Sequence, residues 1–155
     1  MLVVFNANDE GDEVQVPYNY QNTQTVTLRG RLEAELAQLT GEDLEMFMEE
    51  YGVEEQGLDR VIRLSYDLLG LQSFFTVGED EVRAWTVKRT ATALEAAAAI
   101  HTDLAKGFIR AEVVAYEELL ETGSMAGARA AGKLRLEGKQ YPVQDGDIVH
   151  VKFNL

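Results

Sequence analysis

The sequence predicts an α+β protein in two parts, residues 1–70 and residues 71–155. In the second part, a helical spacing of apolar residues over 92–106 changes at once to an extended apolar strand at 109–116. A strand at 82–88 directly precedes that helix and more strands follow it, as expected of a sheet with one helix lying across it. The charge changes near Gly70: residues 1–70 carry 15 acidic and 4 basic side chains, whereas residues 71–155 carry 12 and 10.

Residues 1–70 are predicted to start with two strands and to be mostly helical after residue 30. Leu2–Phe5 and Thr25–Leu28 are typical of strands, and the irregular segment from Gly11 to Gln24 is expected to be a loop. Three apolar stripes with helical spacing follow, and glycines stand at their ends. The stripes comprise Leu32, Leu36 and Leu39; Leu44, Phe47, Met48 and Tyr51; and Leu58, Val61, Ile62, Tyr66 and Leu69.

Residues 71–155 are predicted to form several short strands around one longer helix. Turn signals at Gly138-Lys139-Gln140 and Asp145-Gly146 separate the last of these strands. Strands are expected at 74–76, 82–88, 109–116, 133–137, 141–143 and 147–153, with a short helix at 117–121 and an Ala/Gly-rich turn region at 123–132.

The helix expected at 92–106 has signals at both ends. Thr92 is a suitable N-cap and Glu95 follows three residues later, as in a capping box, while Gly107 stands where a C′ glycine ends a helix. His101 falls on the apolar face, and we interpret it as a core imidazole with a backbone partner, not as a catalyst. That face comprises Leu94, Ala97, Ala98, His101, Leu104, Ala105 and Phe108.

Composition excludes several kinds of protein. The sequence has no cysteine, no apolar run as long as a membrane span and no basic flank typical of a signal peptide, so we expect a cytoplasmic protein. His101 and His150 are the only histidines, too few for a zinc site. With a net charge of −13 the chain is a poor general binder of nucleic acid, because phosphates are neutralised by Lys and Arg. Only residues 71–155 offer enough cations for a local basic face.

Two nucleotide-related patterns need separate interpretation. Asn6-Ala7-Asn8-Asp9 resembles the base-recognition motif of P-loop GTPases, in which the amide supports the loop and the carboxylate accepts from the base; on its own, such a segment is most often only a turn. The phosphate-binding pattern GxxxxGK[ST] does not occur in the 155 residues. Its nearest approach begins at Gly127 and ends in Leu134, which cannot bind Mg²⁺, and we interpret it as a coincidence.

Long phrases of the second part resemble the C-terminal domain of the YchF-type, Obg-like ribosome-binding ATPases. They are EVRAWTV (81–87), IHTDLAKGFIRAEVVAYEEL (100–119) and GKLRLEGKQYPVQDGDIVHVKFN (132–154). A weaker resemblance runs upstream through RLEAELAQL (31–39) and GLDRVIRLSYDLLGLQSFF (57–75). The resemblance implies a TGS module with a β-grasp, ubiquitin-like fold at 71–155, preceded at 1–70 by the C-terminal remnant of a nucleotide-binding domain without its phosphate-binding half.

The resemblance also implies partners. It indicates a translation-associated protein that binds the ribosome or ribosomal RNA, has no membrane or DNA partner, and uses ATP or GTP with Mg²⁺ in the full-length family. Asn6 and Asp9 would recognise the base, although YchF-type ATPases usually have Glu where this chain has Asp9, the residue that guanine-specific relatives use. Arg29-Gly30-Arg31 would occupy the second base-contacting loop, where the family usually has a Ser-Ala pair.

Several interpretations of function remain open at this point. One is a binding and regulatory module of a YchF-type protein with no catalytic residue of its own, and another is a stand-alone TGS-type adaptor for RNA or protein. A ubiquitin-like carrier is set aside because the sequence ends in Asn154-Leu155 and not in Gly-Gly. Six cations could gather on one side of the sheet, either as RNA or ribosome contacts or as ordinary surface charge. They are Lys106, Arg110, Lys133, Arg135, Lys139 and Lys152.

We predict that these 155 residues hydrolyse neither ATP nor GTP. Most of the affinity in such sites comes from phosphates held by loop amides, a Lys and Mg²⁺. Base contacts from Asn6 and Asp9 would each contribute about 0.5–1.5 kcal/mol, or about twice that when charged, which corresponds to about millimolar affinity. Titration calorimetry with Mg²⁺ and either nucleotide should show no tighter binding, and micromolar binding or phosphate release above the buffer blank would contradict this expectation.

Overall fold

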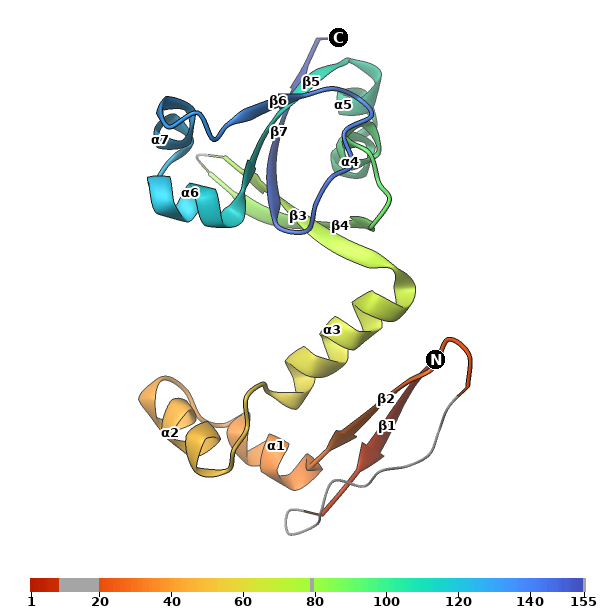
Figure 1. Cartoon of the computed structure of the whole chain (residues 1–155), viewed down its shortest axis with the longest axis vertical. Helices are drawn as coiled ribbons and strands as arrows, with labels where there is room; N and C mark the ends of the chain where they lie inside the picture. Colours follow the sequence, from red (N-terminus) through yellow and green to blue (C-terminus); the bar gives the residue numbers. More distant parts are fainter. Residues whose placement is uncertain (9–19, 79, 155) are drawn as a thin grey trace. The chain divides into compact units, whose positions relative to one another are not determined.

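The computed structural model describes residues 1–8, 20–78 and 80–154 and confirms the predicted α+β class. The chain divides into two compact units, Met1–Leu69 and Gly70–Leu155, which are described separately below. Figure 1 shows the helices and strands of each unit. None of the described helices is both long enough and apolar enough to cross a membrane.

The first unit contains two strands and three helices. Strands β1 (Leu2–Asn6) and β2 (Gln24–Leu28) are parallel, with Val4 opposite Val26, and most of the predicted loop between them lies outside the described residues. The three predicted helices are present as α1 (Gly30–Leu36), α2 (Glu42–Glu50) and α3 (Gly57–Leu69). Among the described residues, the buried apolar side chains of this unit are those of Val26, Leu32 and Leu36.

The second unit is built on a five-stranded sheet with the strand order β4-β3-β7-β5-β6. The strands are β3 (Leu71–Val77), β4 (Val82–Lys88), β5 (Phe108–Ala115), β6 (Arg135–Glu137) and β7 (Asp147–Phe153). Two antiparallel pairings, β3 with β4 and β5 with β7, flank one parallel pairing of β3 with β7. The predicted strands at 82–88 and 147–153 are confirmed with their bounds.

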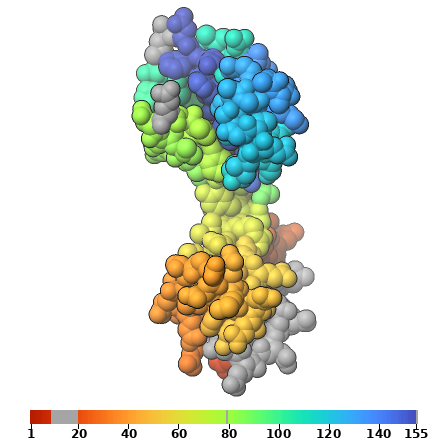
Figure 2. Space-filling view, turned by 90° about the vertical axis from the view of Figure 1, so that its left-hand side faces the viewer, coloured from red at the N-terminus to blue at the C-terminus, as the bar shows by residue number. Residues whose placement is uncertain are grey.

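A different pair of helices packs against each face of this sheet (Figure 1). Helices α4 (Ala93–Ile100) and α5 (Thr102–Lys106) cover one face, where the core includes the fully buried Phe74. Helices α6 (Tyr116–Thr122) and α7 (Met125–Ala130) cover part of the other face, against Val114 and Ile148. The space-filling view shows α6 and α7 side by side on the surface of this unit (Figure 2).

The predicted continuous helix at 92–106 is wrong, because the chain leaves the helical conformation at His101. Its backbone is extended, with φ −163° and ψ 141°, and its Nδ1 accepts a hydrogen bond of 3.2 Å from the Asp103 amide as the N-cap of α5. His101 is therefore exposed, not part of the core. At the other end of α4, the predicted capping box of Thr92 and Glu95 is confirmed.

Three further predictions need correction. The residues of α4 buried in the core are Ala93, Ala96 and Ala97, whereas Ala98, assigned to the apolar face, is exposed. The turn region expected at 123–132 contains α7, which starts at the N-cap Ser124, whose hydroxyl accepts from the Gly127 amide. In place of a strand at 141–143 there is one isolated bridge between Thr92 and Pro142.

Gly107 ends α5, but not by the left-handed conformation that a C′ glycine provides. Its φ is −88°, and a Cβ there would collide with the backbone carbonyl of Asn154. The Gly107 carbonyl also accepts a hydrogen bond of 2.9 Å from the Asn154 amide. Glycine is needed here because the last strand passes directly against the start of β5.

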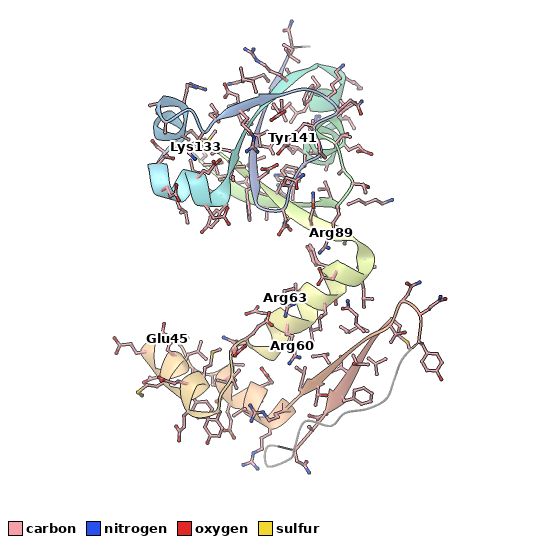
Figure 3. The ribbon with its side chains drawn as sticks, viewed as in Figure 1. Glu45, Arg60, Arg63, Arg89, Lys133 and Tyr141 are labelled. Carbon is pink, nitrogen blue, oxygen red and sulfur yellow. The ribbon has the colours of Figure 1, made fainter. Side chains whose placement is uncertain are left out.

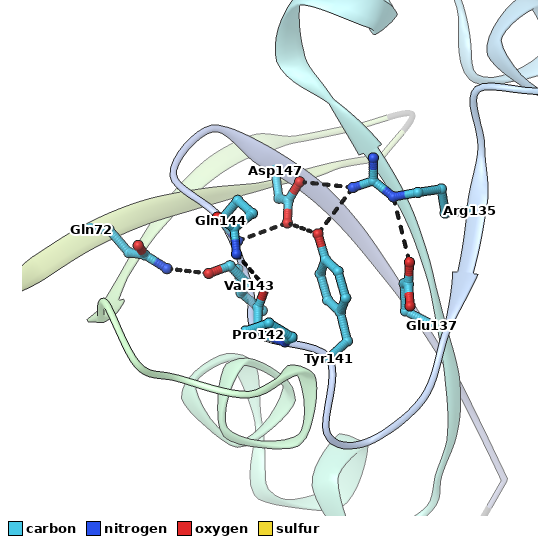
Figure 4. Close-up of polar contacts among 8 residues, drawn as sticks. All are labelled: Gln72, Arg135, Glu137, Tyr141, Pro142, Val143, Gln144 and Asp147. Atoms are coloured by element: carbon cyan, nitrogen blue, oxygen red, sulfur yellow. Dashed lines mark hydrogen bonds and ion pairs between the residues drawn. The ribbon is translucent and has the colours of Figure 1, made fainter.

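A buried carboxylate, that of Asp147, anchors the segment that connects β6 and β7 (Figure 4). Asp147 is 2% exposed; its Oδ2 accepts hydrogen bonds from the Tyr141 hydroxyl at 2.8 Å and from the Gln144 amide at 2.9 Å. The Arg135 guanidinium lies 3.4 Å from Asp147 Oδ1 and donates to the Tyr141 hydroxyl at 3.0 Å. Because a buried charge needs such partners, these bonds hold the segment 138–146 against the sheet.

We predict that Tyr141→Phe destabilises the second unit by about 1–3 kcal/mol, since it leaves Asp147 one hydrogen bond short in a buried site. Urea unfolding followed by the fluorescence of Trp85, the only tryptophan, measures this unit. Tyr116→Phe is the matched control, because Tyr116 is 47% exposed. Equal stability of the two variants would contradict the role given to the Tyr141 hydroxyl.

The same comparison should depend on pH. Burial, reinforced by the bond to Asp147, raises the pKa of Tyr141 to about 12. A raised pKa means that the neutral hydroxyl is the form favoured by folding. Its stabilising contribution is complete below about pH 10, the pKa of an unfolded tyrosine, and is lost as the pH rises towards 12. The difference between wild type and Tyr141→Phe should therefore be constant at neutral pH and shrink above about pH 10.

Candidate functional site

The first candidate site lies where β1 and β2 end, in the first unit. Asn6 is opposite Leu28, so the two parallel strands deliver their following loops to the same edge. The Gly30 amide donates a hydrogen bond of 3.0 Å to Asn6 Oδ1, and the Ala7 amide donates one of 2.8 Å to the Leu28 carbonyl. A Cβ on Gly30 would lie 2.7 Å from Asn6 Oδ1, so this close approach requires glycine.

These contacts place two of the sequence-predicted loops against each other. The Asn6 side chain supports the loop at Arg29-Gly30-Arg31, as its motif predicts for the amide. The other predicted base-binding residue, Asp9, lies outside the described residues. Arg29 itself donates a hydrogen bond of 3.2 Å to the Tyr51 carbonyl.

A cavity of about 380 Å³ lies beside this edge, within the first unit. Its walls carry both signs of charge: Arg29, Glu33, Glu54, Glu55, Arg60 and Arg63. Figure 3 shows Arg60 and Arg63 on α3. The sequence analysis did not select these two arginines, although their three-residue spacing on a predicted helix places them on one side of it.

Two carboxylates organise this cavity. Glu33 Oε2 accepts a hydrogen bond of 2.7 Å from the Gly57 amide, the first of α3, which satisfies a free donor at a helix start. Glu55 accepts two hydrogen bonds from Arg63, at 2.7 and 3.0 Å, and these bonds lower the pKa of Glu55 while they raise that of Arg63. The positive charge of Arg63 is therefore balanced by the negative charge of Glu55.

The second candidate site is the set of six cations predicted from the sequence. The structure brings two of them together, because Arg110 and Lys152 are cross-strand partners on β5 and β7. Arg135 lies on β6 opposite Val113, whose side chain belongs to the core under α4, and so points to the other face of the sheet. The six cations therefore do not gather on one side of the sheet.

The other three cations are distributed around the unit. Lys106 Nζ, on α5, lies 3.2 Å from an Asp103 carboxylate oxygen. Lys133, labelled in Figure 3, forms an ion pair of 3.3 Å with Glu118. Lys139 is exposed in the turn that follows β6.

Arg129 is a further cation that sequence analysis did not select, and it shares a carboxylate with Lys152. It extends from α7, and its guanidinium donates a hydrogen bond of 2.8 Å to Glu112 Oε1, the same carboxylate whose Oε2 lies 3.4 Å from Lys152 Nζ. No sequence signal indicates this contact, since the segment was expected to be a turn. Within residues 1–8, 20–78 and 80–154, no cluster of three or more His, Asp or Glu side chains could hold a metal ion.

Comparisons with known proteins identify the family. Residues 71–154 match the family model YchF-GTPase_C, described as a protein of unknown function (DUF933). The chain is 48% identical over 165 residues to the ribosome-binding ATPase YchF of Bacillus subtilis, covering 99% of this chain and 45% of that protein. It is 45% identical over 129 residues to Obg-like ATPase 1 of Gallus gallus, covering 83% of this chain and 32% of that protein.

Solved structures agree with this assignment. The Schizosaccharomyces pombe YchF GTPase matches 86% of this chain with a TM-score of 0.74 and 34% identity, over 35% of its own length. A GTP-binding protein from Pyrococcus horikoshii shares the fold over 99% of this chain, with a TM-score of 0.68 and 21% identity, over 46% of its own length. The chain thus spans less than half the length of these relatives and aligns with the C-terminal part of the YchF proteins. Because the family model alone matches more than half of its residues, the chain belongs to the YchF family.

Proposed function

We propose that this chain is the binding and regulatory C-terminal portion of a YchF-type, translation-associated protein, and that it acts in the cytoplasm. The observation that carries the proposal is the alignment of 99% of the chain with the C-terminal part of proteins named ribosome-binding ATPases. In this proposal residues 71–155 form a TGS-type β-grasp domain, and residues 1–70 are the end of a nucleotide-binding domain.

The partner we propose is the ribosome, contacted through ribosomal RNA by the second unit. Electrostatics favour this unit, because residues 1–70 have a net charge of −11 and residues 71–155 only −2. RNA phosphates would be repelled by the acidic first unit. They would meet far less repulsion at the second unit, where basic side chains are locally concentrated. Of the six cations named above, the candidate contacts are the two that share a face of the sheet, Arg110 and Lys152, with Arg129 added.

For the first unit we propose a role in recognising the base of ATP or GTP, through Asn6 and Asp9. The support is the hydrogen bond between Asn6 and Gly30, which joins the two loops that such a site requires. The 155 residues contain no GxxxxGK[ST] segment, so the groups that hold phosphates and Mg²⁺ would have to be supplied by other residues. These 155 residues are therefore proposed to bind, not to catalyse.

Sedimentation with purified ribosomes tests this proposal. The chain should pellet with ribosomes at about 50 mM salt and be released as salt rises towards about 200 mM, because phosphate contacts are lost as counterions compete. Residues 1–69 alone, if added in excess, should not displace it. Failure of the whole chain to pellet at low salt would contradict ribosome binding. Pelleting that does not change with salt would contradict contact through RNA phosphates.

A further inference from the structure

One half of a face of the sheet in the second unit is left uncovered by α6 and α7. Side chains alternate along strands, so those that share a face with Val114 and Ile148 include Arg110 and Glu112 on β5 and His150 and Lys152 on β7. Cross-strand pairing places Leu136 of β6 next to Glu112. We call this surface the open sheet face and define it by Arg110, Glu112, Leu136, His150 and Lys152, with Arg129 reaching in from α7.

A single carboxylate organises the cations of the open sheet face. The Glu112 side chain is 11% exposed and forms ion pairs with both Arg129 and Lys152. Burial alone would raise the pKa of Glu112, but the hydrogen bond and charge of Lys152, with the charge of Arg129, outweigh burial and lower it. Glu112 therefore stays ionised at neutral pH and fixes two cations beside each other.

The charges on this face do not balance. The face carries three cations and one carboxylate: Arg129 and Lys152 both pair with Glu112, and among the residues that the structure describes no acceptor or acidic partner is found for Arg110. Arg110 stands directly opposite Lys152, and like charges in that position destabilise a sheet. An anionic partner would remove this repulsion.

The other cations of the unit differ in this respect. Lys106 and Lys133 each have a nearby carboxylate, and Arg135 lies close to both Asp147 and Glu137. Lys139 has no described partner, but no other cation of this set lies in its turn. Its backbone carbonyl accepts a hydrogen bond from the Leu94 amide, so this turn lies on the side of α4. The open sheet face is thus the place where several cations meet with excess positive charge.

We infer that the open sheet face binds the phosphate backbone of unpaired RNA, an inference that rests on the proposed ribosome binding and assigns its site. Arg110, Arg129 and Lys152 supply the phosphate contacts. The exposed His150 and Leu136, the latter 59% exposed, lie among these cations and offer surfaces on which unpaired bases can stack or pack. Contact with bases gives these two side chains a role beside the cations, and competition with polyglutamate, described below, distinguishes RNA from an acidic protein.

Fluorescence anisotropy with a labelled unpaired RNA of about 16 nucleotides tests this inference. The variants are Arg110→Ala and the double variant Arg110→Ala/Lys152→Ala of the whole chain. The matched control is Lys106→Ala/Lys139→Ala, which removes two positive charges from the helix-covered side of the same unit. Arg110→Ala removes no described contact, so it should fold normally even if the double variant is destabilised.

The double variant should bind the RNA about tenfold more weakly or worse, with a salt slope flatter by about 1.4, and the control should bind like wild type. Arg110→Ala alone removes one phosphate contact and should flatten the salt slope by about half as much as the double variant. Absence of RNA binding by the wild type, equal losses in the control, or displacement of the RNA by polyglutamate at equal charge would overturn the inference. Ribosome sedimentation of the same variants separates the two claims: a chain that pellets normally without Arg110 and Lys152 keeps the proposed function and loses this site.

Discussion

The antiparallel pairing of β5 with β7 is the constraint on which the second unit depends. It holds Val113 opposite Val149 and Ala111 opposite Val151, all buried under α4, and so forms the centre of the core. The same register fixes the opposite face, where Arg110 meets Lys152 and Glu112 meets His150. A slip by one residue would exchange the two faces, because side chains alternate along each strand. Core and open sheet face are therefore specified together.

Sequence patterns predicted those elements whose signals are local. The strand at 82–88 is rich in β-branched and aromatic residues, and the Thr92–Glu95 capping box is a pair of side chains within one turn, so both were found from the sequence. The break at His101 was missed because its apolar spacing continues through the interruption, while the imidazole itself caps the following helix. Helix α7 was missed because the glycines at 123, 127 and 132 are turn signals, although its alanines favour a helix, and only Ser124 signals its start.

The candidate sites were harder to predict, because their residues meet through tertiary contacts. Asn6 was identified by its motif, and its bond to Gly30 follows from the parallel pairing of β1 with β2. Which of the six cations share a face depends on the register of β5, β6 and β7, which the sequence does not state. Arg135 contacts the buried Asp147 on the other face of the sheet, whereas Arg129 reaches Glu112 from a helix that was not expected. Counting cations along the sequence could reveal neither outcome.

Lysine reactivity on the ribosome measures the orientation of the bound chain most directly. Lys106 and Lys152 side chains are 72% and 41% exposed, and Lys139 is exposed as well, so all three should react with an amine-acetylating reagent in the free chain. Mass spectrometry of the bound chain should then show Lys152 protected and Lys106 and Lys139 still reactive. Protection of Lys106 and Lys139 with Lys152 unchanged would contradict binding through the open sheet face and assign the contact to the side covered by α4 and α5.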